Sequence, residues 1–264
     1  MEQITAKAPA KINWYLAVKR RRADGYHEIE TVLQTIPLYD TLTFVRTEDS
    51  AIRLDVMGQT AGSVSSDASN LVYRAAELLG VSGLHITLHK NIPAQAGLGG
   101  GSSDAACTLK VLNELYQLGH TQQELAKIAL NLGADVPFFL YGGACIARGI
   151  GEEIEPLPPV TKYKIQIQKP AKSLSTGEIY RLADTFPKVP HPTLEEFLQE
   201  FRQDGNPEKL LYNELESASI ALCPEIAQLK DALMQQGALG ALMSGSGSAV
   251  FGLFETNSAD FKNV

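Results

Sequence analysis

The segment from Pro93 to Ala106 (PAQAGLGGGSSDAA) has the residues best suited to chemistry, since two serines directly follow a glycine run. Glycines let backbone N–H groups turn toward one point, and a helix start adds positive potential there. The hydroxyls of Ser102 and Ser103 can bind phosphate oxygens or Mg²⁺. No lysine follows the glycines, so this is not a Walker A loop. Glycines alone are equally typical of a flexible loop, and the serines favour a phosphate site.

The patterns on either side of this loop predict the elements that hold it. Residues 84–89 alternate apolar with polar side chains, which indicates a strand that ends near Lys90. After the glycines, we expect Ser102 or Ser103 to cap a helix that Gly119 stops. The loop would therefore lie between a strand and a helix.

The rest of the chain is typical of a mixed α and β protein. Pro156, Pro158 and Pro159 suggest a boundary between domains at 1–157 and 158–264. Asn70 or its neighbour Ser69 can cap one helix, and Thr121 can form a capping box with Glu124 at another. We expect a polar connection over 19–25, strands over 8–18, within 26–44, over 144–157, 163–168 and 249–254, and helices over 70–79, 121–133, 193–203, 207–221 and 224–236.

Composition narrows the class of protein. The 264 residues are 44% hydrophobic and 20% charged, which suffices for a packed core. The formal net charge of −7 argues against a nucleic-acid partner, although it leaves room for an anionic small molecule. The basic run Lys19–Arg22 fits a solvated loop better than a nucleic-acid contact. No apolar run reaches the ~20 residues that a membrane span needs.

Location and metal binding are also constrained by the sequence. We find no signal peptide at the N-terminus and expect a cytoplasmic protein. Cys107, Cys145 and Cys223 are widely spaced and odd in number, so we expect buried free thiols. The histidines form no metal-ligand spacing, and we assign no metal ligand to any side chain.

The glycine-rich loop resembles the ATP-binding motif of the GHMP kinases. Pro9–Asn13 (PAKIN) and Leu242–Ser248 (LMSGSGS) stand where that family has its other motifs. Arg22–His27 (RADGYH) and Gly133–Phe139 (GADVPFF) are similar to the diphosphocytidyl-methylerythritol kinases within it. The resemblance runs from residue 8 to about residue 255, and five motifs in order are far more specific than any one.

Two residues matching this family would carry the catalysis. Taken alone, Asp135 fits an Asx-type cap, where the following Val136-Pro137 favours extended backbone, and Lys11 fits a solvated strand lysine. The resemblance places Asp135 on the catalytic aspartate and Lys11 on its lysine partner. An ammonium group keeps a nearby carboxylate ionised, so that it can accept a hydroxyl proton.

The resemblance also assigns binding residues. Tyr26 would stack on a cytosine ring and His27 would bond its edge, although both are consistent with aromatic packing on a hairpin. Asn13 and Thr176 would contact the rest of this substrate. The residues matching the ATP site are Pro93, Gly97, Leu98, Gly99, Gly100, Gly101, Ser102 and Ser103 at the phosphates, with Asn70 and Lys90 near the base. Gly245, Ser246 and Gly247, otherwise a plain glycine turn, would shape the active site.

The fold implied by the resemblance is a two-domain α+β GHMP kinase fold with its active site in the cleft between the domains. The implied reaction is ATP- and Mg²⁺-dependent phosphorylation of the 2-hydroxyl of 4-diphosphocytidyl-2-C-methyl-D-erythritol, in non-mevalonate isoprenoid synthesis. Two alternatives remain open: a kinase for another alcohol such as mevalonate or homoserine, and a nucleotide-binding regulator without catalysis. We also expect the C-terminal domain to lack its last helix and strand.

Overall fold

The computed structural model describes residues 2–256, in two compact units whose segments alternate along the chain. The first unit contains the residues up to Lys11, then Thr35–Ala94 and Gly99–Gly142. The second contains Ile12–Gln34, Gln95–Leu98 and the chain from Gly143 onward. The expected lack of a last helix and strand concerns the end of the chain, which lies outside the described residues. The domain boundary after residue 157 stays a prediction.

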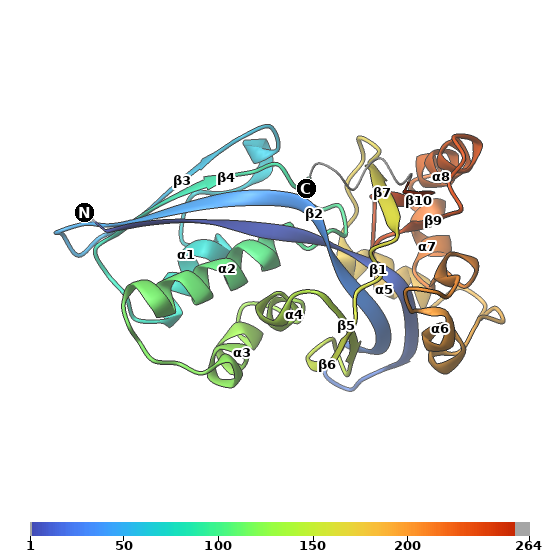
Figure 1. The fold of residues 1–264 in the computed structure, drawn as a ribbon, viewed down its shortest axis with the longest axis horizontal. Coiled ribbons are helices and arrows are strands. Elements are labelled where there is room, and N and C mark those ends of the chain that lie inside the picture. The colour runs from blue at the N-terminus through green and yellow to red at the C-terminus, as the bar shows by residue number, and fades with distance from the viewer. Residues whose placement is uncertain (1, 257–264) are drawn as a thin grey trace. The chain divides into compact units, whose positions relative to one another are not determined.

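Two long strands run through both units (Figure 1). They are β1 (Gln3–Arg21) and β2 (His27–Arg46), which are neighbours in one sheet. The connection expected over residues 19–25 is therefore too long, because β1 continues to Arg21. The basic run Lys19–Arg22 includes the last residues of β1. Two of its side chains form ion pairs with β2, Lys19 with Glu30 and Arg20 with Glu28.

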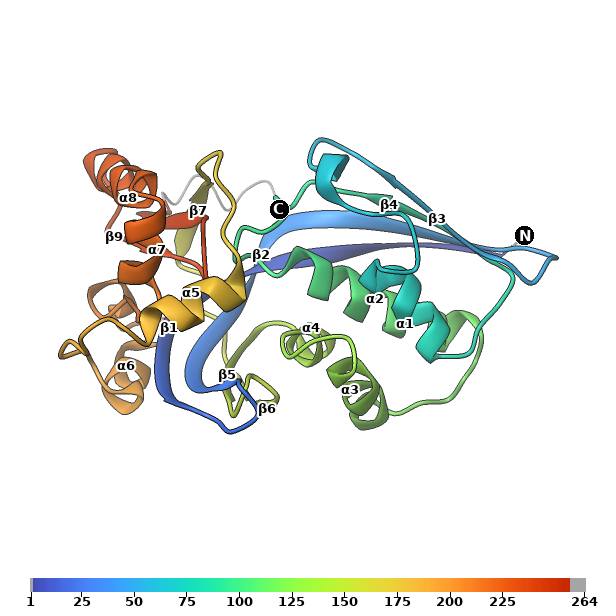
Figure 2. The same cartoon turned by 180° about the vertical axis from the view of Figure 1, so that it is seen from behind.

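The first unit is a sheet covered by helices. β4 (Leu84–His89) pairs antiparallel with β2 and parallel with β3 (Ile52–Met57). The helices α1 and α2 lie along one side of these strands (Figures 1 and 2) and share a core with them. The helical elements of this unit are η1 (Ala61–Ser63), α1 (Leu71–Leu78), α2 (Gly100–Leu115), α3 (Gln122–Leu130) and α4 (Val136–Tyr141).

The second unit contains a three-stranded antiparallel sheet in the order β7-β10-β9, with α8 packed on β9 and β10. A separate pair, β5 and β6, extends from the N-terminal part of β2. The elements of this unit are β5 (Ala144–Arg148), β6 (Glu153–Leu157), β7 (Tyr163–Gln168), α5 (Thr176–Ala183), α6 (Leu194–Glu200), η2 (Pro207–Lys209), β8 (Tyr212–Asn213), α7 (Glu216–Leu222), α8 (Glu225–Gln235), β9 (Gly240–Met243) and β10 (Val250–Glu255).

Predictions that depended on local signals are confirmed. Asn70 caps α1 by accepting the N–H of Val72, and Thr121 with Glu124 forms the capping box of α3. The strand over 163–168 has the expected limits. The three cysteines are free and buried, and burial raises the pKa of the Cys107 thiol to about 12.

Two helix predictions are wrong. The predicted helix over 207–221 is broken, because Tyr212 and Asn213 pair in parallel with β1. Its first residues form only the short 3-10 helix η2, and the α-helix begins at Glu216. The helix after the glycines stops at Leu115, well before Gly119. Tertiary pairing overrides helix propensity in the first case.

The capping box predicts a stability effect without a catalytic one. Thr121→Ala removes the acceptor for the Glu124 N–H, and should lower the free energy of unfolding by about 1 kcal/mol. Urea denaturation with wild-type protein as reference measures this. A variant as stable as the wild type would show that the cap contributes nothing here.

Candidate functional site

Lys11 is buried in the first unit, with only 4% of its surface exposed. Its neighbours Ala10 and Ile12 on β1 are fully buried, so it is not the solvated strand lysine considered above. Burial lowers the pKa of Lys11, and the negative charge of Asp135 offsets part of that effect. The two residues are therefore electrostatically coupled, as an ammonium and carboxylate must be to share a site.

Asp135 begins α4, and its carboxylate makes no capping hydrogen bond to that helix. Its backbone angles (φ −81°, ψ −14°) are helical, so the expected extended backbone is wrong. The following proline, Pro137, occupies the first turn, where a missing N–H breaks no helical hydrogen bond. Because the helix does not use the carboxylate, the Asx-type cap interpretation also fails.

Gly99 brings the start of α2 against Lys11 and α4. Its φ is +71°, and a Cβ here would lie 2.7 Å from the Phe139 ring and 3.1 Å from Cγ of Lys11. Only glycine fits this position. The lysine, the helix that Asp135 begins and the N-terminus of α2 are thus packed together in one unit.

The helix after the glycines begins at Gly100, with Gly99 as its N-cap. The predicted cap at Ser102 or Ser103 is wrong, because both serines lie inside the first turn. Ser103 donates the first helical hydrogen bond, to Gly99 O, so the N–H groups of Gly100 to Ser102 lie ahead of the helical ladder. This arrangement can bind an anion.

Ser103 is 1% exposed, and its hydroxyl has no hydrogen-bond partner among residues 2–256. The next residue, Asp104, lies in a buried charge cluster with Lys90 and Asp40. Burial raises the pKa of Asp104 to about 7, since the Lys90 cation offsets only part of it and Asp40 adds negative charge. Burial by itself lowers the pKa of Lys90. Its two carboxylate partners raise this pKa by more than burial lowers it, so the net shift is upward.

Both residues predicted near the ATP base make structural bonds. Asn70 caps α1 and donates its side-chain amide to Ser65 O, and the ammonium of Lys90 bonds to Asp40 and Asp104. Their contact with the base stays a prediction.

The middle of the glycine-rich loop, Gln95–Leu98, packs within the second unit. Ser244 Oγ donates to Gly97 O at 2.9 Å, and Ala249 N donates to Ala96 O at 3.0 Å. A Cβ on Gly97 would come within 1.9 Å of Ser244 O, so this close approach requires glycine. The two glycine-containing loops are therefore in direct contact.

Side chains from three elements hold the Met243–Ser248 loop. Asn213 donates its amide to Met243 O and Gly245 O, at 2.8 Å each. Ser219 Oγ donates to Ser246 O, and the hydroxyls of Thr176 and Ser246 are 2.9 Å apart. We did not predict Asn213 or Ser219, since nothing in the sequence places them beside this loop.

The predicted nucleobase contacts lie in the second unit. The Tyr26 side chain is exposed, with 59% of the residue's surface open to solvent. His27 is buried, its Nε2 lies 2.9 Å from Asp184 Oδ1, and its ring stacks on Tyr180 with centroids 5.0 Å apart. Sequence reasoning missed Tyr180 and Asp184. Their spacing of four from Thr176 and from each other, on or next to α5, was the available signal.

Asn13 is 3% exposed and held in one orientation by Thr31. Asn13 Nδ2 donates to Thr31 Oγ1 at 2.8 Å, and Thr31 in turn donates to Tyr15 O at 2.6 Å.

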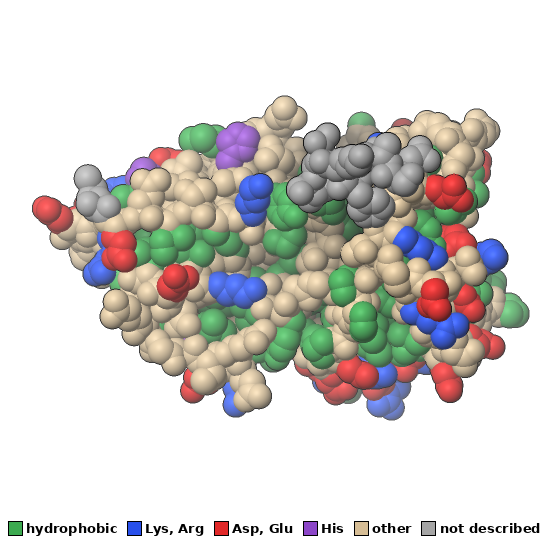
Figure 3. Space-filling view, viewed as in Figure 1, with side chains coloured by type: hydrophobic (Ala, Val, Ile, Leu, Met, Phe, Trp, Pro, Cys, Tyr) green, Lys and Arg blue, Asp and Glu red, His purple; other side chains and the backbone are tan. Residues whose placement is uncertain are grey.

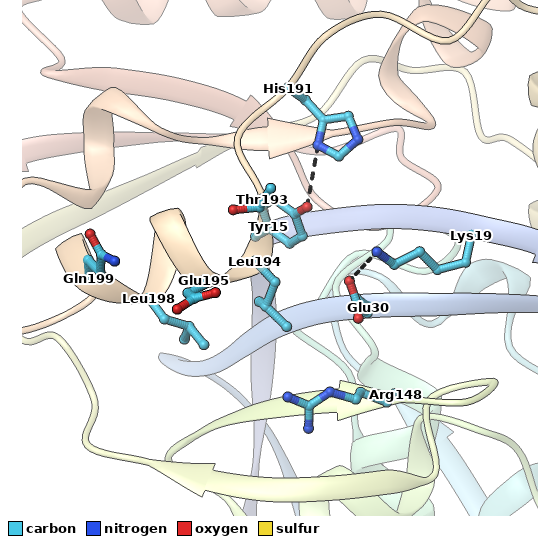
Figure 4. A pocket seen from close by; sticks show the side chains of 10 residues that line it. All are labelled: Tyr15, Lys19, Glu30, Arg148, His191, Thr193, Leu194, Glu195, Leu198 and Gln199. Atoms are coloured by element: carbon cyan, nitrogen blue, oxygen red, sulfur yellow. Dashed lines mark hydrogen bonds and ion pairs between the residues drawn. The ribbon is translucent and has the colours of Figure 1, made fainter.

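A separate cavity of about 660 Å³ lies in the second unit, between α6 and strands β1, β2 and β5 (Figure 4). Lys19, paired with Glu30, and Tyr15, in contact with His191, line it. None of the predicted site residues lines it, so it adds nothing to the motif-based site. On the face in Figure 3, basic side chains are scattered among acidic ones. Within residues 2–256, no helix has the length and apolar character to cross a bilayer, and no cluster of metal-ligating side chains occurs.

Comparison with known proteins extends this picture to the whole chain. The family model for the N-terminal domain of GHMP kinases matches residues 70–143, and that for their C-terminal domain matches residues 188–262. A 4-diphosphocytidyl-2-C-methyl-D-erythritol kinase from Desulfitobacterium hafniense (strain Y51) is 47% identical, over 96% of this chain and 88% of that protein. The enzyme of the same name from Alkaliphilus metalliredigens (strain QYMF) is 40% identical, over 97% and 89%.

Solved structures agree with these relatives. A crystal structure of 4-(cytidine 5'-diphospho)-2C-methyl-D-erythritol kinase superposes with a TM-score of 0.74 at 38% identity, covering 95% of this chain and 90% of that one. A homoserine kinase from Cytophaga hutchinsonii, 22% identical with a TM-score of 0.69, covers 99% and 88% and shows the shared fold alone. The chain is an α+β small-molecule kinase that belongs to the GHMP kinase family and, within it, to the 4-diphosphocytidyl-2-C-methyl-D-erythritol kinases.

Proposed function

We propose that this kinase transfers the γ-phosphoryl group of ATP to the 2-hydroxyl of 4-diphosphocytidyl-2-C-methyl-D-erythritol, in non-mevalonate isoprenoid synthesis. The observation that carries the chemistry is the coupling of buried Lys11 to Asp135 beside the N-terminus of α2. The relatives that bear this name, 40–47% identical over nearly the whole chain, support the substrate.

Asp135 would accept the proton of the attacking hydroxyl. Its carboxylate is not used as a helix cap, and its negative charge interacts with the buried Lys11. Because phosphoryl transfer has a loose transition state, positioning and charge neutralisation contribute more than base strength. Lys11 would also stabilise negative charge that develops on the transferred group.

The glycine-rich loop would hold the triphosphate of ATP through the first-turn amides of α2. Mg²⁺ would accompany the nucleotide and neutralise phosphate charge. The donor set fits this ion modestly: the buried Ser103 hydroxyl is a hard oxygen ligand, and Mg²⁺ in nucleotide sites commonly takes few protein ligands. Asn70 and Lys90 would lie near the base.

The cytidyl group would bind at Tyr26 and His27. The exposed Tyr26 side chain is available for stacking, and Asp184 holds the His27 ring in a defined orientation for a bond to the cytosine edge. Asn13 and Thr176 would contact the remaining substrate, and Gly245, Ser246 and Gly247 would shape the site.

We further propose that residues 1–157 and 158–264 form the two functional domains. The three free cysteines suit the reducing cytoplasm, where we place the reaction.

A panel of alcohols tests the substrate directly. Purified protein is offered 4-diphosphocytidyl-2-C-methyl-D-erythritol, methylerythritol without its cytidyl group, mevalonate and homoserine, and coupled ADP release is followed. We expect turnover on the cytidyl substrate alone. Equal turnover of methylerythritol lacking the cytidyl group contradicts the assignment, and no turnover of any alcohol favours a regulator.

Asp135→Asn should cut kcat by about 10²-fold or more, with the affinity for both substrates retained, because a positioned proton acceptor is lost. Steady-state kinetics and direct ligand titration measure the two effects separately. If the variant keeps most of its kcat, Asp135 is not the base.

Tyr26→Ala should raise the KM for the cytidyl substrate by about 5- to 150-fold, since base stacking on an aromatic ring contributes roughly 1–3 kcal/mol. The KM for ATP should change little. Tyr26→Phe is the matched control, because it keeps the ring and should be nearly silent. Equal losses for both substrates in Tyr26→Ala would mean that Tyr26 supports the fold.

A further inference from the structure

The buried cluster of Asp40, Lys90 and Asp104 connects two stretches of chain that flank the glycine-rich loop. Asp40, on β2, is fully buried, while Lys90 is 3% and Asp104 2% exposed. The Lys90 ammonium bonds to Oδ2 of Asp40 and, at 2.7 Å, to Oδ2 of Asp104. All three residues belong to the first unit.

The Asp40 side of the cluster fixes the entry to the loop. Its second oxygen, Oδ1, accepts the backbone N–H groups of Asn91 at 2.6 Å and Ile92 at 2.9 Å. Lys90 itself follows β4, and its own N–H donates to Met57 O at 2.7 Å. The chain is therefore held firmly at the point where it leaves the sheet.

The Asp104 side fixes the exit. Asp104 lies just past the first turn of α2, directly after the two serines. A Cβ on Gly100 would lie 3.3 Å from Nζ of Lys90, so the ammonium sits against the first residue of the helix. One cation thus joins the entry of the loop, through Asp40, to its exit, through Asp104.

We propose that Lys90 is a positioning residue that ties the two ends of the glycine-rich loop together and thereby holds the α2 amides in place for phosphate. This inference rests on the proposed role of the loop, but it assigns Lys90 a different task from the expected contact with the ATP base. Burying three ionised groups costs free energy, and this cost is offset only while all their partners stay in place.

The two roles of Lys90 are separated by a ligand that has phosphates and no base. Inorganic tripolyphosphate and ATP, each with Mg²⁺, are titrated calorimetrically against the full chain at pH 8, above the pKa of about 7 for Asp104. If Lys90 holds the two ends of the loop together, disrupting the cluster weakens the binding of both ligands equally. If Lys90 contacts the base, disrupting the cluster weakens the binding of ATP alone.

Asp104→Ala cuts the tie and leaves Lys90 with Asp40 as a balanced pair, which makes it safer for folding than removal of the lysine. We expect the Kd for both ligands to rise by roughly tenfold and by the same ratio, as for loss of a bond between charged groups. Asp104→Asn keeps an oxygen acceptor for Lys90 and should restore most of the affinity.

Thr108→Val is the matched control. It removes the buried hydrogen bond that Thr108, one turn further along α2, donates to Asp104 O, and it breaks no ion pair. It should therefore lower the melting temperature and leave both Kd values unchanged. The proposal is overturned if this control loses as much affinity as Asp104→Ala. It is also overturned if Asp104→Ala keeps wild-type affinity, or if it loses affinity for ATP alone. Wild-type protein that binds ATP but no tripolyphosphate would instead overturn the assignment of the loop to phosphate, and the tie with it.

Discussion

The candidate site depends on backbone approaches that leave no room for a side chain. At Gly99 the chain passes so close to Phe139 and Lys11 that any Cβ would overlap the ring. At Gly97 it passes even closer to the carbonyl oxygen of Ser244. Both glycines also have positive φ, so two independent reasons exclude other residues. The start of α2 could not otherwise pack against Lys11, nor the middle of the loop against residues 243–248.

Buried charge is the second organising feature of the first unit. Lys11 is balanced by Asp135, and Lys90 by two carboxylates, so neither ammonium is buried without a counter-charge. Buried ion pairs contribute little net stability, since desolvation offsets their attraction. Such pairs fix the positions of their side chains instead, because a buried charge is stable almost only beside its partner.

The sequence predicted best where one residue decides a local structure. The caps at Asn70 and Thr121 follow from side chains that reach their own backbone, and the strand over 163–168 follows from alternation. It failed at residues 212–213 because a distant segment, β1, pairs with them. It failed at Asp135 for a local reason, since Pro137 lies in the first turn of α4, where proline is compatible with a helix. Ordered motifs were enough for the fold and the family. Asn213 could not be predicted, because it acts on residues far from it in sequence. For Tyr180 and Asp184 the spacing of four from Thr176 was a signal that the sequence analysis did not use.

The interleaving of the two units has a consequence for how the gene can be divided. The chain passes from the first unit to the second between Lys11 and Ile12, inside β1, and back between Gln34 and Thr35, inside β2. Any single break within residues 35–94 or 99–142 leaves each fragment holding pieces of both units. Neither unit is therefore a contiguous module. Recombination at a single point could not exchange one unit and leave the other intact.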